Sequence, residues 1–406
     1  MATSRLAGNV GTSGYKWVAL ALLWFVALLN YVDRQVIFSQ FPLIQRDLHA
    51  TPTELGLISS SFLWVYAVLS PFAGLLADRF GRARSILASL VVWSLATYIT
   101  AHVHSIESMI ASRVLMGVSE AFYLPAALAL LVDLHGPDTR SFAVGIHQSG
   151  LYTGIIVGGA WGGWMGETYG WRSAFMVLGI VGVIYGVLLF FLLRRDVPGN
   201  RRRISLPDFS TVLRSPGFLL LAIAFAAASV ANWLIYTWLP LLLTERFHLT
   251  LAQAGFTATF YIQVASYAGM LAIGFLSDRL ALRWGRARVW VQIAGLLLSA
   301  PFLLILSRTN SYVLVIPVLL MIGIFRPFFD VNAMPVLRQL VPGNLSSTGY
   351  GILNMVGCFG GGIAALAAGY FKNTAGLAAA YQWAAIVLIA GAIPLIMLSR
   401  NRLSDQ

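Results

Sequence analysis

Apolar stretches recur along this sequence from one end of the chain to the other. The candidates lie near 17–38, 53–77, 84–102, 106–133, 140–165, 172–194, 216–244, 253–277, 288–307, 310–338, 345–371 and 377–399. Each has the length of about 20 residues with which an α-helix crosses a bilayer. Only 10% of the 406 residues are charged, against roughly 25% in soluble domains. The sequence therefore predicts an all-α membrane protein with twelve transmembrane helices.

Lysine and arginine are distributed unevenly over the loops between these stretches. An even number of spans places both termini on one side, and most basic residues fall on that side. The other side has only Arg46, Arg172, Arg246, Arg308 and Lys372. Because basic loops stay in the cytoplasm, we predict that both termini are cytoplasmic. The net charge of +12 then reflects membrane topology and does not indicate a nucleic-acid partner.

The middle of the chain divides the spans into six and six. The basic segment 194–215 follows the sixth span and predicts a cytoplasmic linker between two six-helix bundles, 1–193 and 216–406. The two parts share a motif, because GLLADRFGRAR (74–84) follows the second span and GFLSDRLALRWGRAR (274–288) follows the eighth. Matching motifs at matching positions indicate duplicated halves, a common plan among transporters.

The repeated loop motif brings charges to cytoplasmic helix ends. An aspartate there can pair with arginines or cap a neighbouring helix, and so hold one conformation and release another. A plain topology anchor is the alternative, and the occurrence of two copies favours the latch. The predicted latch residues are Gly74, Asp78, Arg79, Arg82, Arg84, Asp278 and Arg279.

GLLADRFGRAR resembles the loop motif of the major facilitator superfamily. RVLMGVSEA (113–121) and YGWRSAF (169–175) are similar to further patterns of that family, and the resemblance covers essentially the whole chain. It implies the major facilitator fold, in which two six-helix bundles surround a central cavity that opens alternately to each side.

A few ionisable residues lie well inside the predicted spans: Asp33, Arg34, Arg113, Glu120, Arg326 and Asp330. Each costs roughly 2.5–3.5 kcal/mol at a helix centre, so we expect each to be paired or to face a cavity. Asp33 and Arg34 point about 100° apart on one helix and need partners on another.

The fourth span offers such partners. Arg113 and Glu120 are seven residues apart and therefore share a helix face. Together with Asp33 and Arg34 they form the simplest neutral network. A purely structural pairing of the first and fourth helices is the alternative.

NYVDR (30–34) together with Arg-x6-Glu in the fourth span resembles the anion:cation symporter group of the superfamily, which takes up sugar acids and other organic anions with protons. The resemblance implies that Asp33 and Glu120 are proton sites and that Arg34 holds the substrate carboxylate. It also implies that Arg113 pairs with Asp33.

Polar residues within apolar helices are candidates for a substrate-binding lining. The same resemblance places substrate-binding groups at Tyr31, Tyr66 and Asn354, and Gln148 is a further polar group in the fifth span. Each such group is individually more often an interhelical hydrogen bond than a ligand contact.

Arg326 and Asp330 are an i, i+4 pair, so mutual neutralisation is one interpretation. The other is a second anion anchor, which would favour dicarboxylates. This pair departs from what the sugar-acid group leads us to expect.

The residues leave two transport functions open. We predict a monomeric, multi-pass protein of the bacterial inner membrane that imports a small organic anion with protons. The alternative is a spinster-like lipid or drug exporter working by proton antiport, because NYVDR and Arg-x6-Glu also resemble spinster-type transporters. With a single cysteine, Cys358, and scattered histidines, the sequence offers no metal cluster and no nucleophile–base pattern. We therefore expect no enzyme activity and no cofactor.

Overall fold

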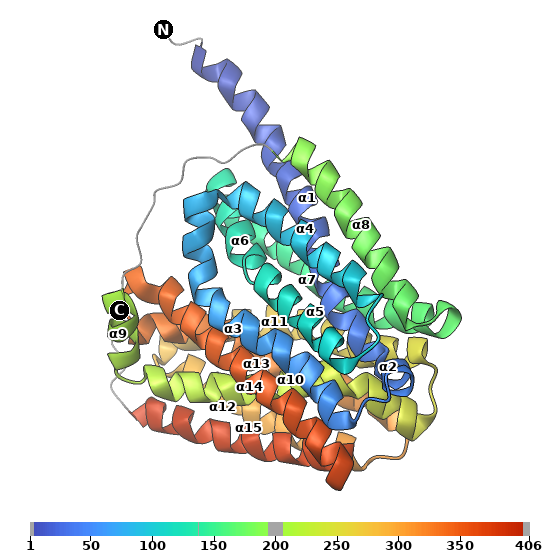
Figure 1. The fold of residues 1–406 in the computed structure, drawn as a ribbon. Coiled ribbons are helices and arrows are strands. Elements are labelled where there is room, and N and C mark those ends of the chain that lie inside the picture. Colours follow the sequence, from blue (N-terminus) through green and yellow to red (C-terminus); the bar gives the residue numbers. More distant parts are fainter. Residues whose placement is uncertain (1–3, 137, 194–205, 401–406) are drawn as a thin grey trace.

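Helices make up nearly all of the chain that the computed structural model describes, which is residues 4–136, 138–193 and 206–400 (Figure 1). In chain order they are α1 (Ser4–Ser39), α2 (Phe41–Asp47), α3 (Pro52–Phe80), α4 (Arg82–Thr100), α5 (Ile106–Glu120), α6 (Tyr123–Leu134), α7 (Arg140–Tyr169), α8 (Trp171–Leu192), α9 (Leu206–Arg214), α10 (Phe218–Phe247), α11 (Leu251–Arg283), α12 (Ala287–Arg308), α13 (Tyr312–Leu340), a short 3₁₀ helix (Gly343–Leu345), α14 (Ser346–Thr374) and α15 (Leu377–Arg400). No strand occurs in these residues, and the predicted all-α class is confirmed.

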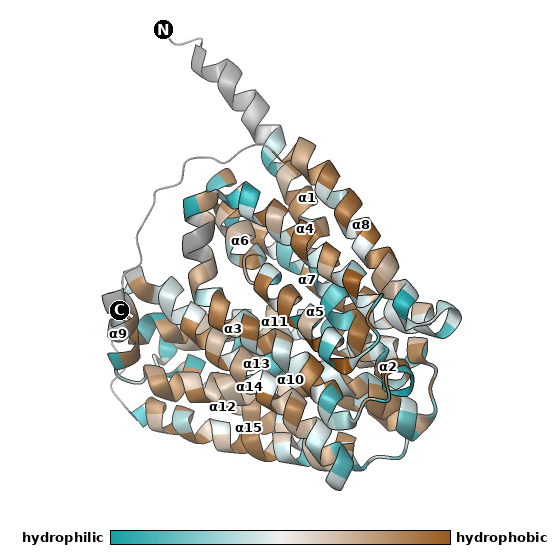
Figure 2. Cartoon of the chain, viewed as in Figure 1, coloured by the Kyte–Doolittle hydropathy of each residue, from teal (hydrophilic) through white to brown (hydrophobic). Residues whose placement is uncertain are grey.

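Eleven helical segments of the described chain are long and apolar enough to cross a membrane, and α5 with α6 counts as one of them. Helix α7 has the length of a span, but its many glycines and its polar side chains reduce its hydropathy. Large apolar side chains cover the outside of the helices, with Phe191 76% exposed and Val313 79% exposed. Figure 2 shows this apolar character along both groups of helices. Such a surface suits contact with lipid and not with water.

The fourth predicted span is not one continuous helix. The apolar run predicts a single helix over 106–133, whereas α5 ends at Glu120 and α6 begins at Tyr123. Pro125 explains the break, because it has no N–H to bond the carbonyl of Ala121 and its ring collides with that carbonyl in a regular helix. The interruption places Glu120 at a helix end inside the membrane.

Two other boundaries differ from the expected ones. Helix α1 begins at Ser4, although its apolar, span-forming part begins at Gly14, close to the predicted residue 17. The predicted linker contains the short helix α9, while its residues 194–205 lie outside the described chain. The division at 1–193, 194–215 and 216–406 stays a prediction.

The two halves of the chain meet most closely on the side opposite the termini. Helix α3 packs on α14, and α7 packs on α11. At both contacts glycine lets the backbones approach, because a Cβ on Gly369 would come within 2.3 Å of the Pro52 carbonyl oxygen and one on Gly163 within 2.2 Å of the Leu251 carbonyl oxygen. Small residues at helix interfaces permit this approach.

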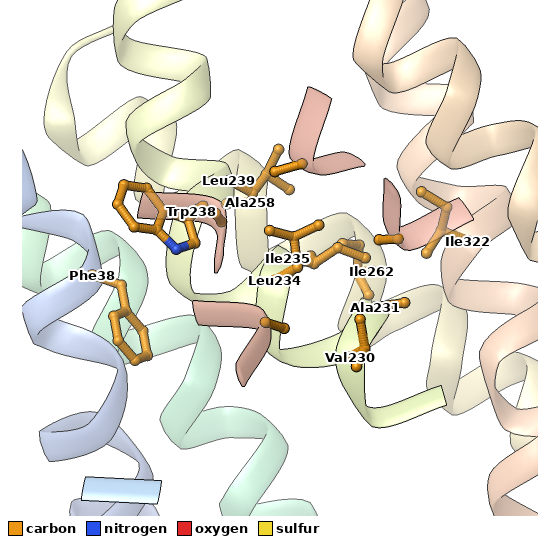
Figure 3. Packing of buried hydrophobic residues seen from close by; sticks show 14 of the residues in the cluster. Phe38, Val230, Ala231, Leu234, Ile235, Trp238, Leu239, Ala258, Ile262 and Ile322 are labelled. Atoms are coloured by element: carbon orange, nitrogen blue, oxygen red, sulfur yellow. The ribbon is translucent and has the colours of Figure 1, made fainter. Parts of the chain in front are cut away.

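A shared hydrophobic core closes the same side. One buried cluster includes Phe38 of α1 and Trp238, Leu239 and Ile262 of the C-terminal half (Figure 3). The Trp238 ring also packs on Phe41 with ring centroids 5.6 Å apart. The halves are therefore in contact at the end of the molecule opposite the termini, which the distribution of basic residues predicts to be the outer side of the membrane.

Candidate functional site

The centre of the N-terminal half contains an ion pair that is removed from water. Arg34 of α1 donates from Nε to Oε2 of Glu120 at 2.5 Å, and their side chains are 8% and 0% exposed. Glu120 is the last residue of α5, directly before the helix break. The cost of burying a charge predicts that both residues have partners on another helix, and the structure pairs them with each other.

Aromatic rings surround the Arg34 guanidinium. Its central carbon lies 4.9 Å from the Tyr31 ring, 5.0 Å from Phe62 and 4.7 Å from Tyr66. These three rings form an aromatic cage, and each ring face attracts the cation. The cage unites the predicted residues Tyr31 and Tyr66 with Arg34. Phe62 was not among the predicted residues, and its i, i+4 spacing from Tyr66 was the available signal.

Arg113 does not make the ion pair that the resemblance implied. Its Nη1 lies 3.1 Å from Sδ of Met116, and its guanidinium lies 5.2 Å from the Phe62 ring. No ion pair within 4.0 Å joins Arg113 to Asp33, although the structure describes both residues. Asp33 lies instead beside Trp93 of α4. The Phe62 ring thus lies near the guanidinium groups of both Arg34 and Arg113.

Several polar atoms in this cluster have no hydrogen-bond partner among the described residues. They are Oδ1 of Asp33, Oε1 of Glu120, Nε of Arg113 and Nδ2 of Asn30, all buried. An unsatisfied buried polar group is costly, and most such groups in folded proteins find partners. The Arg34 cluster, defined as Asp33, Arg34, Arg113 and Glu120, therefore has unused capacity for a polar ligand or a proton.

The other predicted lining residues lie in different places. Asn354 of α14 donates to the Ser70 hydroxyl of α3 at 3.3 Å and so links the two halves. Gln148 of α7 is partly buried, and its Oε1 has no partner in the described chain. Neither residue forms a hydrogen bond with Arg34 in the described structure.

A second charged cluster lies in the C-terminal half. Arg326 of α13 donates from Nε to Oδ2 of Asp330 at 3.3 Å and also donates to the Tyr236 hydroxyl of α10. Gln263 of α11 donates to the same hydroxyl at 3.0 Å. We call Arg326, Asp330, Tyr236 and Gln263 the Arg326 cluster. Tyr236 and Gln263 were missed, because a single polar residue in an apolar span has no pattern of its own.

The two clusters are close to the contact between the halves. Gln35, the neighbour of Arg34, donates to the Tyr236 carbonyl oxygen at 3.4 Å. Tyr152 of α7 packs edge-on against Tyr267 of α11, with ring centroids 5.9 Å apart. The charged groups of each half therefore lie near the interface with the other.

The predicted latch is only partly described. Gly74 and Asp78 belong to α3, but their surroundings lie outside the described structure. Arg79 lies over the Phe80 ring and Arg279 over the Phe275 ring, and Arg84 is exposed.

The remaining latch charges pair within their own halves. Arg82 contacts Asp133 of α6, and Asp278 accepts from Arg288 at 2.8 Å. Arg288 is the closing arginine of the second motif and was not among the predicted residues. The latch remains a prediction.

Comparison with known proteins identifies the family. The family model described as Major Facilitator Superfamily matches residues 23–365. A D-galactonate transporter from Escherichia coli O6:H1 is 25% identical over 94% of this chain and 95% of its own length. An MFS-type efflux pump from Mycolicibacterium smegmatis is 28% identical over 70% of this chain and 68% of its own.

A solved structure has the same fold. It is a bacterial homologue of the human lysosomal transporter Spinster in an inward-facing, unoccupied conformation. It matches with a TM-score of 0.77 and 18% identity, covering 95% of this chain and 96% of that one. The chain therefore belongs to the Major Facilitator Superfamily, and it is a multi-pass membrane transporter and not an enzyme.

Proposed function

We propose that this transporter imports a small organic anion, a sugar acid or related carboxylate, together with protons. The observation that carries the proposal is the buried Arg34–Glu120 pair inside an aromatic cage. Arginine keeps its charge in such a site and offers a planar fork that matches a carboxylate. The similarity to a D-galactonate transporter over 94% of the chain supports the same substrate class.

Substrate binding is coupled to protonation because the substrate carboxylate and Glu120 compete for the Arg34 guanidinium. A substrate carboxylate that binds Arg34 takes the place of Glu120. The displaced Glu120 side chain is 0% exposed, and a buried charge that loses its partner costs about 3–5 kcal/mol. Taking up a proton removes that cost, so substrate binding and protonation favour each other.

Asp33 is the second proton site in this mechanism. It is 3% exposed and has no ion pair within 4.0 Å among the described residues. A buried carboxylate without a counter-charge favours its protonated form. Arg113, held near Phe62, is the cation that Asp33 can engage when it is ionised. The proton leaves Asp33 when the site reaches the cytoplasm.

The setting is the bacterial inner membrane, with both termini in the cytoplasm and the protein acting as a monomer. The distribution of basic residues supports this orientation. The closed outer side fits a state in which substrate is released inward.

Uptake by reconstituted vesicles under an inward proton gradient tests the proposal. The panel consists of labelled aldonates, uronates, aldarates and simple dicarboxylates. We expect accumulation of one class above protein-free vesicles and its loss on adding a protonophore. Asp33→Asn and Glu120→Gln should each exchange substrate without accumulating it. Glu107→Gln is the matched control, because Glu107 lies on the same helix as Glu120 and is exposed.

No uptake of any anion would contradict the proposal. Proton-driven release of a lipid or drug from the same vesicles would support the exporter alternative, which the similarity to an efflux pump keeps open.

A further inference from the structure

The Arg326 cluster is more open than the Arg34 cluster. The side chains of Arg326 and Asp330 are 18% and 37% exposed, although both lie within the membrane-spanning helix α13. Ionisable residues inside spans face a water-filled cavity or the interior of the bundle and not lipid. The exposed part of Asp330 therefore faces a water-filled space that a soluble ligand can enter.

Hydrogen bonding in this cluster leaves donors unused. The Tyr236 oxygen accepts from both Arg326 and Gln263, and among the described residues no acceptor receives its own O–H. Arginine has five N–H donors. Arg326 uses Nε for Asp330 and Nη1 for Tyr236. A cation with spare donors beside a free phenolic O–H is an arrangement that binds an anion.

A cavity adjoins these donors. The cavity is small and lies against Arg326 and Asp330, and Asn232 and Ser299 complete its polar lining. Apolar residues of α10, α12, α13 and α15 form the rest of the wall. An apolar wall with a few convergent polar groups is typical of small-molecule sites.

Asp330 binds the Arg326 guanidinium only weakly. Their contact is a single hydrogen bond of 3.3 Å between residues on the same helix. A free carboxylate can approach a guanidinium with two parallel bonds, which an i, i+4 neighbour does not make here. Asp330 therefore acts as a partner that a ligand carboxylate can displace.

We propose that Arg326 and Tyr236 form a second carboxylate subsite, so that this transporter prefers dicarboxylates to monocarboxylates of the same carbon chain. The inference rests on the proposed function and identifies its substrate class. Arg34 binds one carboxylate from the N-terminal half, and Arg326 binds the other from the C-terminal half. The hydrogen bond from Gln35, the neighbour of Arg34, to the Tyr236 carbonyl oxygen connects the two subsites. A dianion that reaches both arginines joins the halves.

Ligand-dependent thermal stability of the purified protein tests the subsite with a matched pair, glucarate and gluconate. The wild-type protein should bind glucarate about tenfold or more tightly than gluconate, since a hydrogen bond to a charged group contributes roughly 1.5–3 kcal/mol. Arg326→Gln should weaken glucarate binding by about tenfold or more and gluconate binding far less, which removes the preference. Tyr236→Phe should reduce the preference by a smaller factor.

Asp330→Asn is the complementary variant, and it remains informative if Arg326→Gln does not fold. It releases Arg326 from its internal partner and should tighten glucarate binding severalfold. A preference that is absent from the wild type, or that survives both Arg326→Gln and Tyr236→Phe, would overturn the subsite while leaving organic-anion transport intact. Failure of both ligands to bind the wild type would overturn the subsite and the proposed function together.

Discussion

The two halves of this transporter each contain an arginine–carboxylate pair, but the surroundings of the two pairs differ. Arg34 and Glu120 come from separate helices, lie 2.5 Å apart and are 8% and 0% exposed. Arg326 and Asp330 share one helix, lie 3.3 Å apart and are 18% and 37% exposed. A pair removed from water cannot lose one partner without a large cost, whereas an open pair can exchange its partner with solvent or ligand. We therefore propose that the buried pair links carboxylate binding at Arg34 to protonation of Glu120, and that the open pair lets Arg326 exchange Asp330 for a ligand carboxylate.

Removing one carboxylate from each pair is the strongest test of this comparison. Glu120→Leu leaves Arg34 buried without a counter-charge and should lower the free energy of unfolding by about 3–5 kcal/mol. Asp330→Ala acts on a partly exposed pair and should cost no more than about 1 kcal/mol. Thermal unfolding of the purified variants in detergent measures both effects.

A double variant serves as the control for the buried pair. Arg34→Met with Glu120→Leu removes both charges and should recover most of the lost stability, because apolar residues can replace a buried ion pair. Equal decreases in the free energy of unfolding for Glu120→Leu and Asp330→Ala would show that burial does not distinguish the two pairs.

A third prediction concerns the contact between α7 and α11 that holds the two halves together. On the proposed function, both arginine–carboxylate pairs can bind one substrate only when the halves approach each other. Glu167 of α7 accepts from the backbone N–H of Leu251 at 3.0 Å and of Ala252 at 3.5 Å, at the start of α11. A carboxylate at a helix N-terminus contributes about 0.3–1 kcal/mol. Glu167→Gln should therefore increase outer opening by about two- to fivefold.

Labelling from outside measures this opening. A cysteine at Thr259, which faces Gly159 across the interface, is introduced into a Cys358→Ser background. A membrane-impermeant thiol reagent added from outside should react faster with this cysteine in the Glu167→Gln protein. Glu245→Gln is the matched control, because Glu245 pairs with Lys372 inside the C-terminal half. An unchanged labelling rate would contradict the closing role of Glu167.

The smallest expected effect concerns an arginine at the outer end of each half. Arg172 donates to Asp47 at 2.5 Å, and this bond holds the pKa of Asp47 below its ordinary value. Arg246 donates instead to the carbonyl oxygens of Leu306 and Ser307 at 3.1 Å, at the end of α12. Only the first contact contains a titrating carboxylate, so only the first should respond to acid.

The sign follows from the lowered pKa. The Asp47 contribution is fully present above its ordinary pKa of about 3.9 and is lost as the pH falls through the lowered value. Acidification from about pH 6 to about pH 3 should destabilise the wild type more than Asp47→Asn, by less than about 1 kcal/mol, because the pair is exposed. Arg246→Gln should shift the unfolding temperature equally at both pH values. A pH-dependent shift in that variant would contradict the contrast.

Sequence reasoning identified the ionisable groups but not all of their contacts. Hydropathy revealed Arg34 and Glu120, and the cost of burying a charge required that each have a partner. The expected pair of Asp33 with Arg113 does not form in this structure, and the Arg113 guanidinium lies instead near the Phe62 ring and Met116. The uninterrupted apolar run also predicted a continuous fourth span, whereas the helix breaks near Pro125 without any loss of apolar character.

The sequence alone determined that the chain spans a membrane many times, that it contains a repeated motif in two halves, and that its few internal charges need partners. These properties depend on the hydrophobicity and charge of individual residues, so they can be read locally along the chain. Only the tertiary structure decided that Arg34 pairs with Glu120, that Tyr236 and Gln263 join Arg326, and that the halves close on the outer side. Those contacts join residues far apart in the sequence, and the packing of helix against helix selects them from many arrangements that satisfy the same hydropathy.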